Sequence, residues 1–244
     1  MNEYLKLLSK INFEYWLTKN PYFSDETINP SMKKILKQIH SAGYLKNFKP
    51  SKASDYVNKI EYEIENFNFN QPNFNNLSDI FDLIQAWGGW MGRLPYVGQK
   101  KSRLNFDNWK QDYLEGSMFC KKNKPIDALK KWLSIDYIGM SFATKHIRFW
   151  SNEYPILDAR MNLILCGNKN LLRVAENYET YLNLIQELAS IYKSNILETE
   201  KAIFAFNQNF FENDKLVLYG DILDQTDSDV AKKYHYCINR VSRK

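Results

Sequence analysis

The stretch that most constrains the fold runs from Leu133 to Met161 and reads LSIDYIGMSFATKHIRFWSNEYPILDARM. It predicts a helix end, a tight turn at Tyr137-Ile138-Gly139-Met140, a second helix from Ser141 to Trp150, and a short loop that ends at Asp158. Gly139 suits a sharp turn, because a residue without a Cβ tolerates a positive φ. The amides that open the second helix have no partners inside it, so they can hold an anion such as a phosphate.

The remainder of the chain also shows helical spacing of its apolar residues. Its 244 residues, 44% of them apolar, are enough for one large domain or two small lobes. The best strand candidate, Leu216 to Tyr219, is short. We therefore expect a mostly α fold. The further helices that the pattern predicts are Tyr4–Leu17, Ser31–Leu45, Tyr56–Phe67, Asp79–Trp87, Trp109–Phe119, Pro125–Ser134, Ala159–Leu165, Tyr178–Tyr192 and Glu198–Gln208.

Charge is unevenly distributed along the chain. The formal net charge is +5, but Ala86 to Arg173 holds 15 Lys and Arg against 7 Asp and Glu, a net of +8, so the rest sums to −3. A basic middle suits a nucleic-acid cleft, because phosphates supply most of the affinity. A solvated basic face explains the same pattern equally well.

Cysteine usage and hydropathy exclude several other classes. Cys120, Cys166 and Cys237 are isolated from one another, so they form no disulfide framework, zinc pattern or four-cysteine iron–sulfur site. The first residues do not show a charged segment followed by an apolar one, and no apolar run approaches 18 residues, so we expect neither a secretory leader nor a membrane span. His40 and His235 have no partners at metal-ligand spacing. We expect a cytoplasmic protein with no cofactor and no catalytic metal.

The central stretch resembles the helix-hairpin-helix (HhH-GPD) superfamily of DNA glycosylases. Ile138-Gly139 matches the family's last hydrophobic-glycine pair, and Ala143 matches the small residue that lets the two hairpin helices pack closely. Pro155-Ile156-Leu157-Asp158 resembles the segment that carries the catalytic aspartate, although Asp136-Tyr137 stands where the family has Pro-Gly. The resemblance covers about a third of the chain and implies two helical lobes around a DNA-binding cleft. The lobe with the hairpin would span roughly 76–169, and roughly 1–75 and 170–244 would form the other, within a single unit of 1–244.

The resemblance assigns chemistry to two residues. An ionised carboxylate at Asp158 would stabilise the positive charge that builds on the sugar as an N-glycosidic bond breaks, and would orient water. Asp158 is also a candidate helix cap, and the two roles are compatible.

Family members that also cut the strand use a lysine two residues after the hairpin glycine, where this chain has Ser141. Lys145 lies one helical turn later, about 6 Å along the axis, and the run Phe142-Ala143-Thr144-Lys145 resembles divergent 8-oxoguanine glycosylases. Lys145 is thus a candidate Schiff-base nucleophile, phosphate contact or solvated lysine.

Other residues are candidates for binding. Base excision requires the target base to leave the stack, and a tryptophan can act as wedge or pocket wall, although tryptophans in a helical protein are more often core. The Trp87-Gly88-Gly89-Trp90 stretch also allows close approach of the backbone to a ligand or to another helix. His146 is a phosphate contact or, more often for a residue of this kind, a structural histidine. The predicted DNA-binding residues are Gly139, Met140, Ser141, His146, Arg148, Arg160, Lys100 and Lys101, and the predicted pocket or wedge residues are Trp87 and Trp90.

Two functions from different classes follow. The first is a DNA glycosylase that acts as a monomer on double-stranded DNA in base-excision repair, with an oxidised guanine favoured by the FATK run. An alkylated, mismatched or hypermodified base stays open, and the last would fit phage defence. The second is a non-catalytic helix-hairpin-helix protein that grips the DNA backbone.

Overall fold

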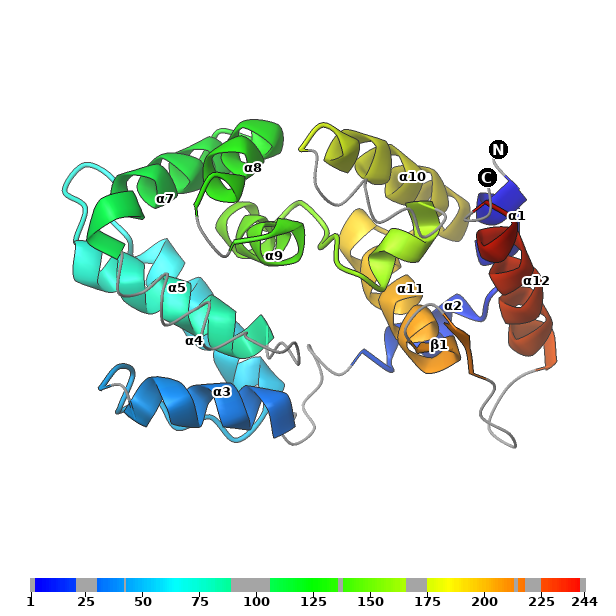
Figure 1. Cartoon of the computed structure of the whole chain (residues 1–244), viewed down its shortest axis with the longest axis horizontal. Coiled ribbons are helices and arrows are strands. Elements are labelled where there is room, and N and C mark those ends of the chain that lie inside the picture. The colour runs from blue at the N-terminus through cyan, green and yellow to red at the C-terminus, as the bar shows by residue number, and fades with distance from the viewer. Residues whose placement is uncertain are drawn as a thin grey trace. The chain divides into compact units, whose positions relative to one another are not determined.

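The computed structural model describes residues 3–20, 30–41, 43–88, 106–135, 138–165, 175–212, 215–217 and 225–241. These residues are mostly helical, which confirms the expected fold class (Figure 1). A pair of two-residue strands, β1 (Phe211–Glu212) and β2 (Lys215–Leu216), runs antiparallel. Of the helices in these ranges, none is long and apolar enough to cross a membrane. The helices are α1 (Glu3–Leu8), α2 (Phe13–Leu17), α3 (Pro30–Ser41), α4 (Ala53–Glu65), α5 (Phe74–Gly88), α7 (Phe106–Lys121), α8 (Pro125–Leu133), α9 (Met140–Ser151), the 3₁₀ helix η1 (Met161–Leu165), α10 (Asn177–Tyr192), α11 (Ile196–Phe210) and α12 (Gln225–Val241).

The chain divides into two compact units. Unit 1 comprises residues 1–20 and 153–244, and unit 2 comprises residues 21–152. This division differs from the predicted one, in which residues 21–75 belonged with the C-terminal part and residues 153–169 with the hairpin. The reason is packing: the apolar faces of α3 and α4 are buried and both helices lie against α5, which is in the same unit as the hairpin.

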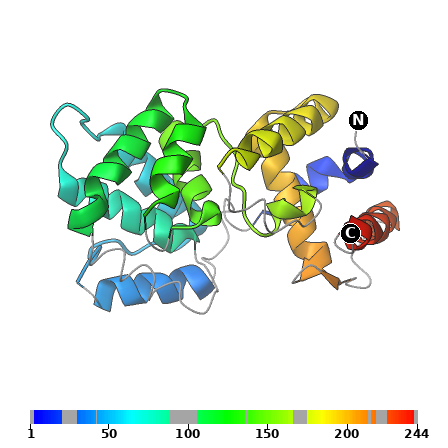
Figure 2. The same ribbon diagram turned by 45° about the horizontal axis from the view of Figure 1, so that its top comes forward.

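Unit 2 is built around α5 and α9, both buried on most of their surface. From Leu77 to Gly88 every residue of α5 except Asp79 is buried, and the helix contacts α3, α4, α7 and α9. A helix with no solvent-facing side is typical of the interior of a helical domain. The green helices α7, α8 and α9 lie side by side in both views (Figures 1 and 2).

A glycine explains how closely α7 and α8 approach each other. A Cβ added at Gly116 of α7 would lie 2.2 Å from Nε1 of Trp132 in α8. The Trp132 indole is fully buried and donates a hydrogen bond of 3.2 Å to the Tyr113 carbonyl, so it cannot move aside cheaply. Gly116 therefore allows α7 to pack closely against α8, the first helix of the α8–α9 pair.

Unit 1 joins the start of the chain to its end. Trp16 of α2 packs edge-on against Phe206 and Phe210 of α11, with ring centroids 5.8 and 5.6 Å away. Its Nε1 donates a hydrogen bond of 2.7 Å to the Asp227 carboxylate of α12, and Asn12 N donates to the same carboxylate at 3.0 Å. Helix α11 also packs on α10 and η1, which places the Asp158 loop on this core.

Several predicted elements change at their ends. The single helix predicted for Tyr4–Leu17 is two helices, because the Asn12 side chain accepts a hydrogen bond from Tyr15 N and starts α2 afresh. Residues 159–160 form a turn, so the predicted helix Ala159–Leu165 is reduced to the short 3₁₀ helix η1. The strand candidate is confirmed only in part, since β2 ends at Leu216 and Leu218–Tyr219 lie outside the described residues. Helix α12 was not predicted.

Candidate functional site

The predicted helix pair exists, and its inner side is tightly packed. Helix α8 ends at Leu133 and α9 begins at Met140, and the two helices contact each other. Ile135 N donates to the Trp132 carbonyl and Ile138 N to the Ile135 carbonyl, each at 3.1 Å, which tightens the connection. Ala143 is fully buried, as expected for the small residue between the helices. Asp136 and Tyr137 lie outside the described residues.

Gly139 does not have the conformation that was predicted. Its φ is −93° and its ψ is 173°, extended values that any residue adopts. Among the described residues, no atom lies within 4 Å of the place where a Cβ would stand. Gly139 also gives α9 no side-chain cap. The described residues thus leave open space beside Gly139, at the start of α9.

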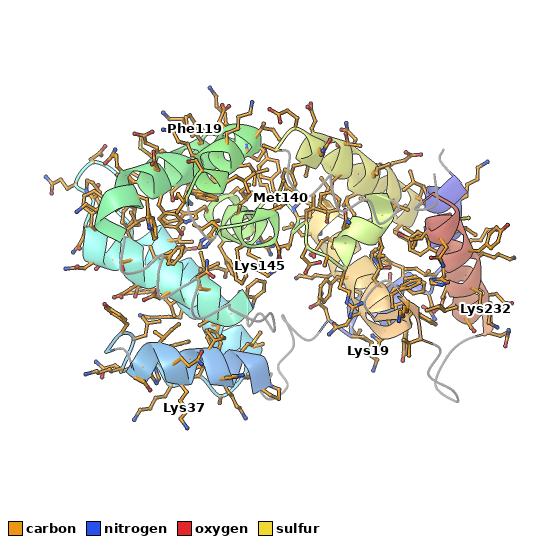
Figure 3. All side chains as sticks on the ribbon, in the orientation of Figure 1. Lys19, Lys37, Phe119, Met140, Lys145 and Lys232 are labelled. Carbon is orange, nitrogen blue, oxygen red and sulfur yellow. The ribbon has the colours of Figure 1, made fainter. Side chains whose placement is uncertain are left out.

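The Lys145 side chain is buried within unit 2 and runs back along α9. Only 7% of the residue is exposed. Its Nζ donates to Ser141 Oγ at 3.0 Å, lies 3.4 Å from the Ser141 carbonyl oxygen and stands 5.1 Å from the centre of the Phe142 ring. The amine therefore reaches back to Ser141, one helical turn earlier on α9. Of the three alternatives, the solvated lysine is excluded by this burial. Met140 and Lys145 are labelled on α9 in Figure 3.

His146 is a structural histidine, and the predicted phosphate contact is not supported. The residue is fully buried; its Nδ1 is 2.7 Å from the Tyr113 hydroxyl and its Nε2 is 3.1 Å from Gln85 Nε2. The ring stacks on Phe81 at an interplanar angle of 9°. Burial, with the neighbouring Lys145 charge, lowers the pKa of His146 to about 3. A neutral imidazole held in this way has no access to DNA.

The side chain of Arg148 is also turned away from solvent. It is 5% exposed and donates a hydrogen bond from Nη1 to the Asn152 side chain, at the far end of α9 from Gly139. Asn152 ends the helix in a left-handed conformation with a φ of 59°. The geometry assigns Arg148 to the C-terminal end of α9, so the phosphate contact predicted for it is not supported.

Asp158 caps the turn that leads into η1. Its Oδ1 accepts hydrogen bonds from Arg160 N at 2.9 Å and Met161 N at 3.1 Å, and its carbonyl accepts one from Asn162 N at 2.8 Å. The predicted capping role is confirmed. The side chain is half-buried, and two backbone amides fix its orientation.

Side chains from α10 and α11 hold the loop on either side of Asp158. The Tyr178 hydroxyl donates to the Pro155 carbonyl, and the Tyr181 hydroxyl donates to the Ile156 carbonyl at 2.6 Å. Asn207 Nδ2 donates to the Arg160 carbonyl at 2.9 Å. Burial raises the pKa of the Tyr181 hydroxyl well above its usual value, and the Glu200 and Asp158 charges add to it. Sequence reasoning missed these three side chains, because no local pattern links them to the loop.

Of the tryptophans proposed as wedge or pocket wall, Trp87 belongs to the core of unit 2. It is 1% exposed and packs edge-on against Phe149, with ring centroids 4.8 Å apart. A wedge must be exposed before it meets DNA, so that role is not supported for Trp87. Trp90, Lys100 and Lys101 lie outside the described residues. Ser141 and Arg160 are half-buried, and their contacts with DNA stay predictions, as does the cleft.

The excess positive charge lies in the unit that contains α9. Unit 2 holds 19 Lys and Arg against 13 Asp and Glu, a net of +6, whereas unit 1 holds 14 against 15, a net of −1. Some of these lysines are neutralised locally: Lys131 lies 2.7 Å from Glu115 and 3.3 Å from Asp112. Within the described ranges, no cluster of three or more His, Cys, Asp or Glu residues has a geometry that could hold a metal.

No protein-family model, curated protein sequence or solved structure matches this chain.

Proposed function

We propose that this protein is a DNA glycosylase that hydrolyses the N-glycosidic bond of a flipped-out damaged or modified base, with Asp158 as its catalytic carboxylate. The observation that carries the proposal is the arrangement around Asp158. One carboxylate oxygen is held by two backbone amides, in a loop clamped by Tyr178, Tyr181 and Asn207. A helix cap alone needs no such clamp, whereas a carboxylate that must meet C1′ at a set distance benefits from fixed orientation.

The net positive charge of unit 2 and the start of α9 support DNA as the substrate. The open, uncapped start of α9 at Gly139 provides amides for a phosphate, and the net charge of unit 2 attracts a polyanion. Phosphate contacts would position the strand without reading its sequence. A base-binding pocket would determine which base is removed, and the residues described above do not form that pocket. Repair of damaged DNA and defence against modified viral DNA are therefore both compatible with the proposal.

Lys145 would give the enzyme a second activity, in which its amine takes the place of water as the nucleophile at C1′. Its amine lies 3.0 Å from Ser141 Oγ, where related lyases carry their own lysine. Attack of that amine on C1′ would form a Schiff base and lead to strand cleavage. Without such attack, water activated by Asp158 is the nucleophile and the enzyme is monofunctional.

The alternative is a protein that grips the DNA backbone without excision. The same open start of α9 favours it, because amides and basic residues alone are enough for phosphate binding. In this case Asp158 would be a cap only. The carboxylate separates the alternatives, because a negative charge near DNA lowers affinity in both cases and is useful there only to a protein that catalyses excision.

The deciding experiment measures excision and covalent trapping separately. The protein is incubated with duplexes that each carry one oxidised, alkylated, mismatched or hypermodified base, and with an abasic duplex. Hot alkali reveals excision, and borohydride traps a Schiff base. Asp158→Asn keeps a capping side chain, so excision should fall by at least about 100-fold while DNA binding persists or tightens.

Two lysine variants complete the design. A trapped adduct that is lost in Lys145→Gln and kept in Lys131→Gln, whose lysine is paired with Asp112 and Glu115, would make the enzyme bifunctional. Excision without trapping would make it monofunctional. Salt-sensitive binding with no excision on any duplex would overturn the glycosylase and favour the binding protein.

A further inference from the structure

The path of the Lys145 side chain is set by residues from two helices. Its stem passes Gly88, the last residue of α5, and the Phe142 ring, and its amine ends at Ser141. We call Gly88, Ser141 and Phe142 the lysine cradle. All of it lies in unit 2, where α5 contacts α9.

Gly88 makes room for the stem. A Cβ built at this residue would lie 2.8 Å from Phe142 Cε1, 3.2 Å from Lys145 Cδ and 3.5 Å from Lys145 Cε. The first distance is shorter than real carbon contacts allow, so any side chain at Gly88 would displace the ring or the lysine. The glycine in the Trp87-Gly88 pair therefore serves close approach to another helix, one of the two alternatives that its sequence left open.

Ser141 supplies a neutral group that can hold an amine in both protonation states. A hydroxyl accepts a hydrogen bond from an ammonium and donates one to a neutral amine. A carboxylate in its place would favour the ammonium, which cannot act as a nucleophile. With 7% of Lys145 exposed, water contributes little to orienting the amine, and the hydroxyl at 3.0 Å takes on that task.

We propose that Ser141 is the positioning residue for the Lys145 amine and that Gly88 keeps the path of its stem open, so that the amine is held beside Ser141 in the first turn of α9. This inference rests on the proposed function, since it concerns the amine that would attack C1′. In that step the N–C1′ bond forms as the C1′–base bond breaks, and the departing base takes the electron pair. The new secondary ammonium gives up its two protons in turn. The first goes to the departing base, and the second goes to O4′ as the C1′–O4′ bond breaks and the sugar ring opens to the imine.

The first arm of the test needs no DNA. Formaldehyde and cyanoborohydride methylate lysine amines, and peptide mass spectrometry gives the rate at Lys145 relative to the exposed Lys37 of α3. Held and buried, the Lys145 amine should react slowly in the wild-type protein. Ser141→Ala and Gly88→Ala should each release it and raise its relative rate at least about threefold, whereas Ser141→Thr, which keeps the hydroxyl, should leave the rate as in the wild type.

A control excludes simple unfolding. Lys131 and Lys59 are paired with carboxylates in the same unit, and their labelling rates should stay unchanged in every variant. Unchanged labelling of Lys145 in both Ser141→Ala and Gly88→Ala would overturn the cradle, whatever the protein does to DNA.

The second arm measures borohydride trapping on an abasic duplex. Ser141→Ala should slow single-turnover trapping at least about tenfold while the Kd for the duplex changes little, because misplacing a reacting group by about 1 Å can cost 100-fold. Ser141→Thr should recover most of the rate. Equal trapping by wild type and Ser141→Ala would contradict the positioning role. Absence of trapping by the wild type, with the labelling result as expected, would instead reject the lyase activity and leave the cradle intact.

Discussion

The starts of α9 and η1 were both predicted to face DNA, and they are held in place in opposite ways. Helix α9 starts at Gly139 with no side-chain cap and nothing within 4 Å of the missing Cβ among the described residues. The packing of its buried residues His146, Trp150 and Ala143 in the core of unit 2 holds it in place. The start of η1 is fixed at its own backbone, by the Asp158 carboxylate and by hydroxyls from α10. Packing behind a helix leaves its end open to a ligand, whereas hydrogen bonds at the loop fix one side chain in place.

The largest effect should come from breaking the support behind α9. Gly116→Ala puts a methyl group against the buried Trp132 indole, 2.2 Å from Nε1, and should lower the free energy of unfolding by about 3 kcal/mol, near the upper end for overpacking. Hydrogen exchange read by peptide should quicken across α7, α8 and α9. If hydrogen exchange quickened equally in α10 and α11, the starts of α9 and η1 would not be stabilised independently of each other.

Acid should weaken the same support. His146 is neutral in the fold with a pKa of about 3, but in the unfolded chain its pKa is near 6.5. The unfolded state binds more protons between these values, so stability is complete above about pH 6.5 and is lost as the pH falls toward 3. The loss from about pH 7.5 to about pH 5 should be about 2 kcal/mol. Urea unfolding at both pH values should show it, and His146→Gln should flatten the dependence.

Removing the cap at η1 should have a smaller effect. Asp158→Ala deletes the acceptor for the Arg160 and Met161 amides and should cost about 1 kcal/mol. Asp158→Asn keeps an acceptor and should cost a few tenths of that. Hydrogen exchange should quicken at residues 159–165 and stay unchanged in α9. A loss of stability in the Asn variant as large as in the Ala variant would contradict capping as the structural role.

The smallest effect on stability should be at Gly139. Its φ of −93° suits alanine, which restricts the unfolded chain, but alanine is a poorer N-cap residue than glycine. The two effects oppose each other, so Gly139→Ala should change the free energy of unfolding by less than about 0.5 kcal/mol. The same methyl group should weaken DNA binding severalfold, because it fills the open space at the start of α9. Fluorescence anisotropy with a labelled duplex measures the affinity. Unchanged affinity would mean that no phosphate approaches there.

Local patterns predicted the helices well, and partners distant in sequence explain the rest. Ser141 and Lys145 were placed on one face because a spacing of four residues is a property of the helix itself. The burial of His146 could not be predicted from local sequence, because its partners Gln85 and Tyr113 are 61 and 33 residues away. Thr144, Lys145, His146 and Arg148 are polar or charged residues, which predicts exposure, yet all four are buried.

Helix α12 is an element that the sequence analysis did not predict. Its inner residues, Val230, Ala231, Tyr234 and Ile238, follow helical spacing, but they are sparse among charged and polar neighbours. Recognition of this spacing would have predicted the helix. The positive φ expected at Gly139 was wrong for a different reason: composition suggests a turn, but not which backbone angles the turn uses.

The division into units has a consequence for how the chain matures during translation. Unit 2 is continuous from 21 to 152, whereas unit 1 needs residues from both sides of it. The hydrogen bond between Trp16 and Asp227 spans 211 positions. Domains generally fold as units as they are synthesised. Unit 2 can therefore complete its core before α11 and α12, on which α2 packs, have been synthesised. The Asp158 loop therefore acquires its clamp only after the cradle around Lys145 has formed.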